Sequence, residues 1–460
     1  MKAAMATGFA TVVPSSVFGA NDDIRMAVIG INSRGGAHIN AYRNMKGVRL
    51  VALCDVSQKA FERRAKGLGK IEKYVDVRKM LDNKGIDAVS IATPNHWHSL
   101  MTIWACQAGK DVYVEKPCSH NVFEGRKCVE AARKYNRIVQ HGTQSRTNKK
   151  RVRRVAAARS GKYGKLLVAK GYCCKPRWSI GYKPIKSPPS SLNFNLWLGP
   201  APEQPYHDNL VPYNWHWFQD FGNGDIGNQG VHEMDLARWG IKGATLPRSV
   251  VSLGGRWVNG PGFRDQGETA NQVVSVFDYG DSLLLFETRG LVGKHKDFPK
   301  IVDYEFYLED GVIRGDKFYP GGKDKGEELV DADYHIYPGG IFGNFINCVR
   351  SRRYQELNAD ILEGHYSSAV CHLGNISYVM GTQSKFEKPK DFSDNKIVGD
   401  SVMTLLENTK AIGVSPTDTT LCVGPKLAFN PETEKFIDNP AADRLLTRPY
   451  RAPFVVPENV

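Results

Sequence analysis

Hydrophobic positions in the first 150 residues form short apolar runs that alternate with amphipathic stretches. The apolar runs, which predict strands, lie at 24–30, 48–55, 88–92, 112–115 and 138–141. The stretches between them that predict helices lie at 35–45, 100–108 and 122–135. Strands and helices that take turns in this way predict a parallel sheet covered by helices on both faces.

The pattern changes after about residue 165. Aromatic-rich sequence, which we expect to form loops, leads into segments of alternating polarity at 249–258, 272–279, 282–289 and 302–308, which predict antiparallel strands. Helices are expected at 340–351 and 361–379. We therefore divide the chain into a first domain at 21–150, a second domain at 151–415, and a tail at 416–460 that wraps the surface.

The first twenty residues differ from both domains. Lys2 is followed by small and apolar residues, and the first charged cluster begins at Asp22. This pattern is typical of an export signal that has lost its first residues, and it predicts a periplasmic or exported protein. The alternative is a disordered tail on a cytoplasmic protein. No stretch reaches the roughly 20 apolar residues of a membrane helix, so we expect no integral membrane segment.

Composition restricts the partners. Hydrophobic residues make up 41% and charged residues 24% of the 460 residues, as in soluble globular proteins. The net charge of +14 calls for anionic partners to be considered, but no nucleic-acid motif accompanies the basic run at 149–154, which predicts a solvated helix face. The nine cysteines form no C-x-x-C pair, so we expect mostly free, buried thiols and no metal site.

A turn that follows the first strand carries the first candidate chemistry. Its residues are Gly30, Asn32, Ser33, Arg34 and Gly35. Glycines at such a turn allow the backbone to approach the diphosphate of a dinucleotide at the helix N-terminus, although Asn32 occupies the position of the second glycine. Asp55 ends the next strand, where a carboxylate binds both ribose hydroxyls, and no arginine follows it directly. These features favour NAD over NADP.

Two more strand ends carry polar residues. Thr93, Asn95 and His98 follow the strand at 88–92, and Glu115 and Lys116 end the next strand. Ligands bind outside the carboxyl ends of the strands in such sheets, so we expect these residues to face the cofactor. A lysine there donates to a substrate oxygen and stabilises the negative charge that grows on it.

These motifs, in order, resemble the glucose-fructose oxidoreductase / inositol dehydrogenase / MocA (Gfo/Idh/MocA) family from about residue 24 to about residue 385. The matching segments are Gly30 with Gly35, Thr93-Pro94-Asn95 with His98, Glu115-Lys116-Pro117, and His232 within 227–235. The resemblance implies an α/β protein in which an N-terminal Rossmann doubly wound parallel sheet precedes a C-terminal α+β domain with an open, mostly antiparallel sheet. It also implies NAD(P)-dependent oxidation or reduction of sugars and cyclitols. The second sheet often serves in oligomer contacts, so we expect a homo-oligomer, a dimer or a tetramer.

The resemblance also assigns roles to individual residues. Lys116 is expected to be the catalytic lysine and His232 the acid/base. Glu115 is expected beside the nicotinamide, and Asn95 and His98 along the ribose and phosphate side of the cofactor.

One position departs from the family pattern. Members commonly place an aspartate four residues before the histidine, and this chain has Asn228 there. An amide orients an imidazole but supplies no charge to it. Either Asp225 or Asp235 substitutes for the missing carboxylate, or His232 is a weaker base than usual.

Aromatic residues precede His232 and suggest the substrate class. They are Trp178, Tyr182, Trp197, Tyr206, Tyr213, Trp215 and Trp217. Aromatic faces stack on the C–H face of a sugar ring, although core packing is the alternative for each residue. We select Trp178, Trp215, Trp217 and Asp235 as the candidate substrate residues.

Three functions remain open. The leading hypothesis is an NAD-dependent sugar or cyclitol dehydrogenase. The second is a redox-assisted glycosidase or lyase, or a sugar–sugar oxidoreductase, that retains and recycles its NAD, although the Gly-His motif of the related NAD-dependent α-N-acetylgalactosaminidases is not recognisable. The third is a non-catalytic protein that binds NAD and sugar, which Asn228 would permit.

Overall fold

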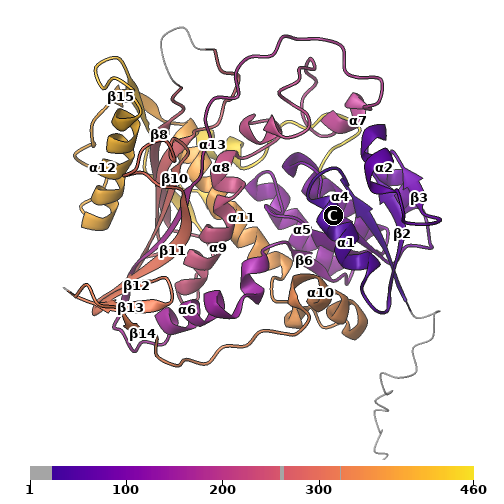
Figure 1. Cartoon of the computed structure of the whole chain (residues 1–460), viewed down its shortest axis with the longest axis horizontal. Coiled ribbons are helices and arrows are strands. Elements are labelled where there is room, and N and C mark those ends of the chain that lie inside the picture. Colours follow the sequence, from indigo (N-terminus) through magenta and orange to yellow (C-terminus); the bar gives the residue numbers. More distant parts are fainter. Residues whose placement is uncertain (1–22, 259–263, 322) are drawn as a thin grey trace, which may run out of the picture.

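The computed structural model describes residues 23–258, 264–321 and 323–460, so the expected export signal lies outside the described residues. Two sheets stand side by side, and a layer of helices separates them (Figure 1). The predicted fold class is confirmed: a parallel sheet lies in the N-terminal half and a mostly antiparallel sheet follows it.

The first sheet has six parallel strands in the order β3-β2-β1-β4-β5-β6. The strands are β1 (Ile24–Ile29), β2 (Val48–Cys54), β3 (Glu72–Tyr74), β4 (Ala88–Ile91), β5 (Asp111–Val114) and β6 (Val139–His141). The order reverses between β1 and β4, and a crevice for ligands opens at such a switch point. The predicted strands therefore form, and they leave their carboxyl ends along one edge.

Helices cover both faces of this sheet. One face packs against α3 (Val77–Leu81), α4 (Asn95–Gln107) and α5 (Val122–Lys134). The opposite face packs against α1 (Gly35–Arg43), α2 (Gln58–Arg64) and α10 (Gly340–Ser351). Because both faces are buried, the strands are almost continuously apolar rather than alternating, as the sequence pattern shows.

The second sheet follows the path β14-β13-β12-β11-β7-β10-β9-β8-β16-β15, with β17 and β18 beside it. Its strands are β7 (Leu166–Cys174), β8 (Ser249–Gly255), β9 (Gln272–Asp278), β10 (Leu283–Arg289), β11 (Ile301–Leu308), β12 (Gly311–Arg314), β13 (Lys317–Pro320), β14 (Glu327–Glu328), β15 (Thr382–Lys385), β16 (Thr420–Val423), β17 (Leu427–Asn430) and β18 (Lys435–Phe436). Only β7 and β10 pair in parallel; the other described pairs in this sheet are antiparallel.

Helices also lie on both faces of the second sheet. The face toward the Rossmann domain carries α6 (Lys149–Arg159), α9 (Gly230–Gly240) and α11 (Ile361–Val379) (Figure 1). The outer face is partly covered by α12 (Lys396–Ala411), whose apolar side chains pack on β8, β9 and β10. The short helices α7 (Phe194–Leu198), α8 (Gly224–Gly227) and α13 (Pro440–Asp443) lie in the connections.

Distant segments complete the core of the Rossmann domain. Phe345 of α10 is fully buried against β1 and α1, and Phe454 is buried against α4. The tail at 416–460 therefore does more than wrap the surface. Its first part adds β16 to the second sheet, and its last residues pack on the first domain, where the yellow end of the chain lies in Figure 1.

Several elements have no counterpart in the sequence-based expectation, among them α2, β3, α3 and the short strands β12 to β18, and two further cases are informative. Strand β7 occupies a stretch that we expected to form loops, because its lysine and glycine interrupt the apolar run. Helix α12 has no counterpart in the predicted elements, although it buries Val398, Val402 and Leu405 on one face. All nine cysteines are unpaired and buried, as expected. None of the helices in the described ranges is sufficiently long and apolar to cross a membrane.

Candidate active site

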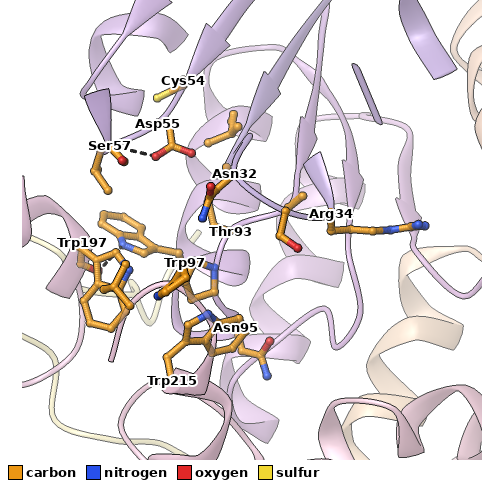
Figure 2. Close-up of a pocket in the computed structure, with 18 of the residues that line it drawn as sticks. Asn32, Arg34, Cys54, Asp55, Ser57, Thr93, Asn95, Trp97, Trp197 and Trp215 are labelled. Carbon is orange, nitrogen blue, oxygen red and sulfur yellow. Dashed lines mark hydrogen bonds between the residues drawn. The ribbon is translucent and has the colours of Figure 1, made fainter. Parts of the chain in front are cut away.

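A cleft of about 670 Å³ lies at the carboxyl edge of the parallel sheet, where the second domain faces it. Its walls come from the ends of β1, β2, β4 and β5, from the loop at 189–216, and from α9. Figure 2 shows Asp55 and Ser57 on one side of the cleft and the rings of Trp97, Trp197 and Trp215 on another. The cleft therefore lies at the switch point where Rossmann folds bind their ligands.

The glycine-rich turn is closely packed. Gly30 has a φ of 78°, and a Cβ atom on it would lie 2.7 Å from the carbonyl carbon of Ala92 and from the nitrogen of Thr93. A Cβ atom on Gly35 would lie 2.0 Å from the Gly30 oxygen. Gly30 lines the cleft and Gly35 does not, so Gly35 serves the packing of α1 against the turn.

Asn32 occupies the position of the second glycine of the motif, and its side chain is hydrogen-bonded to α2. The Arg63 guanidinium donates to the Asn32 side-chain oxygen and backbone oxygen, and Arg64 donates to the same backbone oxygen at 3.0 Å. Within the described chain, the backbone amides of Ser33 and Arg34 donate to no other residue. Free amides at the start of a helix suit a diphosphate, so the turn retains its donors despite Asn32.

Asp55 is fixed at the end of β2. Its carboxylate accepts a hydrogen bond from the backbone amide of Ser57 at 2.9 Å (Figure 2) and another from the backbone amide of Ile31 at 2.8 Å. Burial raises the pKa of Asp55, while these amides act in the opposite direction. Each carboxylate oxygen retains a lone pair for a ribose hydroxyl, so the site fits the nucleoside end of NAD.

Two cations beside Asp55 escaped sequence reasoning. Lys59 and Arg63 lie on α2 and line the same cleft. They are one helical turn apart and therefore share a face of the helix. The sequence shows how far Lys59 and Arg63 lie from Asp55 along the chain. Only the position of α2 in the structure shows that both residues line the cleft.

Glu115 is nearly buried at the end of β5 and is held by two basic side chains. Arg34 Nε donates to it at 2.7 Å, and His38 Nε2 lies 3.0 Å from the same oxygen. Burial alone would raise the pKa of Glu115, but the hydrogen bond from His38 and the charge of Arg34 hold it well below its usual range. The Arg34 side chain is consequently directed to Glu115 and away from Asp55 (Figure 2).

Lys116 connects the two domains. Its ammonium donates to the Asn228 backbone oxygen at 2.6 Å and to the Asn228 side-chain oxygen at 3.2 Å. Burial lowers the pKa of Lys116, and the neighbouring Glu115 and Asp225 act in the opposite direction. Both Lys116 and Asn228 line the cleft, so the structure brings these two predicted residues together.

His232 lines the same cleft from the first turn of α9. Burial, and then the ammonium of Lys116, lower its pKa to about 3. Among the described residues, no hydrogen bond joins the His232 ring to Asp225 or Asp235. Asp235 is fully buried and accepts from Arg146 and Ser367, and Asp225 accepts from Arg177 at 2.9 Å. Neither carboxylate is therefore hydrogen-bonded to the ring, and Asp235 acts on His232 through its charge, in the direction that raises the pKa.

Residues after β4 support the site in different ways. Thr93, Asn95 and His98 all line the cleft. Both ring nitrogens of His98 face backbone oxygens, that of Pro117 at 2.6 Å and that of Thr93 at 2.8 Å. His98 therefore ties the ends of β4 and β5 together. Asn95 Nδ2 donates to Asn223 Oδ1 of the second domain at 2.9 Å.

The candidate substrate residues divide into two groups. Trp215 lines the cleft, whereas Trp178, Trp217 and Asp235 do not. Trp178 packs against the apolar cluster between α12 and the outer face of the second sheet, and its ring lies under the ammonium of Lys294. Trp217 is 6% exposed, and its ring lies under the guanidinium of Arg177. The core-packing alternative thus describes these two tryptophans. The other aromatic residues of the predicted cluster that line the cleft are Trp197, Tyr206 and Tyr213.

Other cleft residues were also missed from the sequence, among them Trp97, Gln144 and His216. The His216 ring stacks on Trp215 with centroids 3.6 Å apart, and burial lowers its pKa to about 3. His216 lies between two tryptophans already selected, so its position was the available signal.

Comparisons with known proteins agree with this geometry. Residues 24–143 match the description "Oxidoreductase family, NAD-binding Rossmann fold", and residues 149–251 match "Oxidoreductase family, C-terminal alpha/beta domain". The fold and the cleft thus define an oxidoreductase with an NAD-binding Rossmann domain. Both matched segments are domains of the Gfo/Idh/MocA oxidoreductase family, which confirms the resemblance stated from the motifs.

Curated relatives cover only part of the chain. A glycosyl hydrolase family 109 protein of a Shewanella species is 27% identical over 169 residues, which is 35% of this chain and 37% of the relative. An alpha-N-acetylgalactosaminidase of Shewanella oneidensis is 26% identical over 167 residues, which is 34% of this chain and 36% of the relative. The alignment thus spans little more than a third of these relatives.

Solved structures share the fold over a longer stretch. The WlbA dehydrogenase of Bordetella pertussis, in complex with NADH and UDP-GlcNAcA, has a TM-score of 0.56 and 20% identity, and the match covers 76% of this chain and 95% of that one. A levoglucosan dehydrogenase in complex with NADH has a TM-score of 0.53 and 18% identity, with 76% and 97% covered. At these identities the likeness shows the fold alone.

The position of Asp55 predicts cofactor choice. In Asp55→Asn, the affinity for NADH measured by calorimetry should fall by about 10- to 100-fold, because charge-assisted hydrogen bonds to the ribose are lost. The ratio of NADPH to NADH affinity should rise, because the carboxylate no longer repels a 2′-phosphate. The exposed Asp82→Ala is the matched control. Unchanged affinity and an unchanged ratio would contradict this role of Asp55.

Proposed function

We propose that the protein is an NAD-dependent oxidoreductase that acts on a carbinol carbon of a sugar or cyclitol. The observation that carries the proposal is the meeting of Lys116 and His232 in one cleft with the glycine-rich turn and Asp55. These residues come from opposite domains, and a substrate between them would face an ammonium and a neutral imidazole. The site therefore unites groups that bind an oxygen with a group that moves a proton.

Bound NAD would supply the acceptor or donor for the two electrons and hydrogen that leave or enter the carbinol carbon. Lys116 would donate a hydrogen bond to the substrate oxygen and stabilise negative charge on it as its proton leaves. His232 Nδ1 or Nε2 would take that proton, because a lowered pKa keeps the ring neutral at ordinary pH. In the reverse direction the protonated ring would return the proton to the oxygen.

Asn228 orients Lys116 in this proposal. Its backbone and side-chain oxygens accept from the ammonium, and its amide nitrogen lies 3.4 Å from Asp225. The Asn228 side chain is uncharged, so it does not raise the pKa of His232 as a carboxylate at this position would. The imidazole therefore stays neutral and is a weak base. An asparagine in place of the family aspartate therefore still holds the Lys116 ammonium in position.

The walls of the cleft favour a carbohydrate. Trp97, Trp197, Trp215 and Tyr213 place aromatic surface in the cleft, and Gln144 and His216 add polar groups. Aromatic surface combined with a few hydrogen-bonding groups suits a ring that has an apolar C–H face and polar hydroxyls. The substrate class thus rests on residues of the loop at 189–216 as much as on those of the Rossmann domain.

Substitution of the two reacting residues tests the proposal. Lys116→Met and His232→Gln should each lower kcat/KM for the sugar by about 10²- to 10⁴-fold, with NADH still bound. The matched controls Lys296→Met and His295→Gln lie on an exposed loop and should retain activity. Steady-state kinetics and NADH fluorescence measure both effects. A kcat/KM within tenfold of the wild-type value in either cleft variant would exclude the role assigned to that residue.

The pH dependence of kcat/KM follows from the two pKa shifts. His232 has a pKa of about 3, so the proton-accepting form persists as pH falls, and the acid limb should lie below pH 6.5. Burial lowers the pKa of Lys116 from its usual 10.5. As pH rises, the ammonium therefore loses its charge before pH 10.5 is reached, and activity should fall there. Lys116→Arg should move the basic limb upward, because arginine stays charged. An acid limb at the ordinary histidine pKa would contradict the burial of His232.

A second function is favoured by the curated relatives. Two of these are a glycosyl hydrolase family 109 protein and an alpha-N-acetylgalactosaminidase, and this fits redox-assisted glycoside cleavage with a recycled cofactor. Export, expected from residues 1–20, would also separate the protein from free NAD. In that case dialysed protein should retain near-stoichiometric NAD(H) and release nitrophenol from nitrophenyl glycosides without added cofactor. A dialysed protein that has lost its cofactor and needs added NAD for sugar oxidation would exclude this alternative.

A further inference from the structure

The segment at 189–198, a loop that ends in the short helix α7 and is called the loop below, forms one wall of the cleft. Leu192, Leu196 and Trp197 of this loop line the cleft together with Asp55 and Ser57 of the Rossmann domain. This part of the cleft is the ribose side of the dinucleotide pocket, because Asp55 ends β2 there. The second domain thus closes over a binding surface that the first domain provides.

Backbone hydrogen bonds join this loop to the residues directly after Asp55. The Gln58 amide donates to the Ser191 oxygen at 2.8 Å, and the Asn193 amide donates to the Val56 oxygen at 2.9 Å. The bridge between Ser57 and Leu192 lies between these two bonds. A dinucleotide that leaves on this side must break these contacts.

Helix α4 holds the other end of the loop. The Trp97 indole nitrogen donates to the backbone oxygens of Leu196 and Trp197, each at 3.1 Å, and His96 Nε2 lies 2.9 Å from the Trp197 oxygen. Trp97 is 4% exposed and also lines the cleft. The same indole therefore lines the cleft and supports the loop.

The C-terminal segment lies against this junction from outside. Arg451 donates to the Gly199 oxygen at 3.0 Å, to Asn195 Oδ1 at 2.6 Å and to the Asn195 oxygen at 2.7 Å. Its own amide donates to the Pro200 oxygen at 3.2 Å. All three nitrogens of the Arg451 guanidinium thus donate to oxygens of Asn195, in α7, and of Gly199, directly after it.

The segment is itself anchored on the Rossmann domain. The Phe454 ring meets Trp97 edge to face, with centroids 5.4 Å apart. Tyr450 donates to the buried Glu124 of α5 at 3.1 Å. Arg448 lies 3.0 Å from His120 Nδ1 and donates to the Asp220 oxygen at 2.7 Å. The C-terminal segment is thus bound to the Rossmann domain on both sides of Arg451, and through Arg451 it restrains the loop.

We propose that residues 448–456 form a latch that fixes the loop at 189–198 over the ribose side of the pocket, and that Arg451 is the positioning residue that limits the rate of dinucleotide exchange. The inference rests on the proposed function only where NAD binding in this cleft is concerned. It adds that cofactor turnover is set by a segment that contacts neither the cofactor nor the substrate.

Cofactor exchange is the measurement that tests the latch. Full-length protein is loaded with NADH and chased with excess NAD⁺, and the loss of bound-NADH fluorescence gives the dissociation rate. Arg451→Ala should release NADH about tenfold faster or more, because three charge-assisted hydrogen bonds hold the loop. Arg451→Lys should restore part of the slow release, since an ammonium reaches fewer of the three acceptors.

Controls separate the latch from general damage. Arg444→Ala changes an exposed arginine of the same tail and should release NADH at the wild-type rate. Asn195→Ala removes one acceptor of Arg451 and should accelerate release by a smaller factor, even if Arg451→Ala fails to fold. The thermal midpoint is measured for each variant. Faster release in a variant whose midpoint matches that of the wild type supports the latch.

Two outcomes would overturn the proposal. One is release at the wild-type rate from both Asn195→Ala and whichever Arg451 variants fold. The other is an equal acceleration in Arg444→Ala. Because the assay measures binding alone, the absence of sugar oxidation would remove the proposed function while a latch effect on NADH release still stood. Failure of the wild-type protein to bind NADH would remove both.

Discussion

A buried carboxylate at the end of β5 is the constraint on which the site depends. Glu115 is 4% exposed, and a carboxylate in that position is costly unless basic groups meet it. Arg34 from the glycine-rich turn and His38 from α1 meet it, so the turn is fixed relative to β5. The next residue is Lys116, whose ammonium then reaches Asn228 across the domain boundary. Charge neutralisation in one domain thereby positions the reacting group toward the other.

The cleft is assembled from segments that are far apart in the sequence. The sheet edge supplies the cofactor side, α9 supplies His232, and the loop at 189–216 supplies the aromatic wall. Helix α11 lies between the two sheets and bonds to the Rossmann domain through Ser368, whose hydroxyl accepts from the Cys118 amide at 3.1 Å. A shared helix layer holds the domains in register, so residues from both sides meet in one cleft.

Periodicity and motifs predicted most of the Rossmann domain, because buried parallel strands are short apolar runs and polar residues at their carboxyl ends converge on one edge. The same reasoning found Asp55 and Lys116, whereas His232 was selected from the family resemblance. It could not separate Trp215, which lines the cleft, from Trp178 and Trp217, which pack elsewhere, because stacking and packing select the same residue type. Lys59 and the tail contacts of Arg451 depend on tertiary placement, which no local pattern records.

The late position of two packing segments has a consequence for folding during synthesis. Phe345 and Phe454 complete the Rossmann core, yet they follow its last strand by some 200 and 300 residues. An N-terminal domain usually folds while the rest of the chain is still being made. Here the parts of β1 and α4 that contact Phe345 and Phe454 stay uncovered until those residues have left the ribosome. The first domain therefore exposes hydrophobic surface, which chaperones bind, for most of translation.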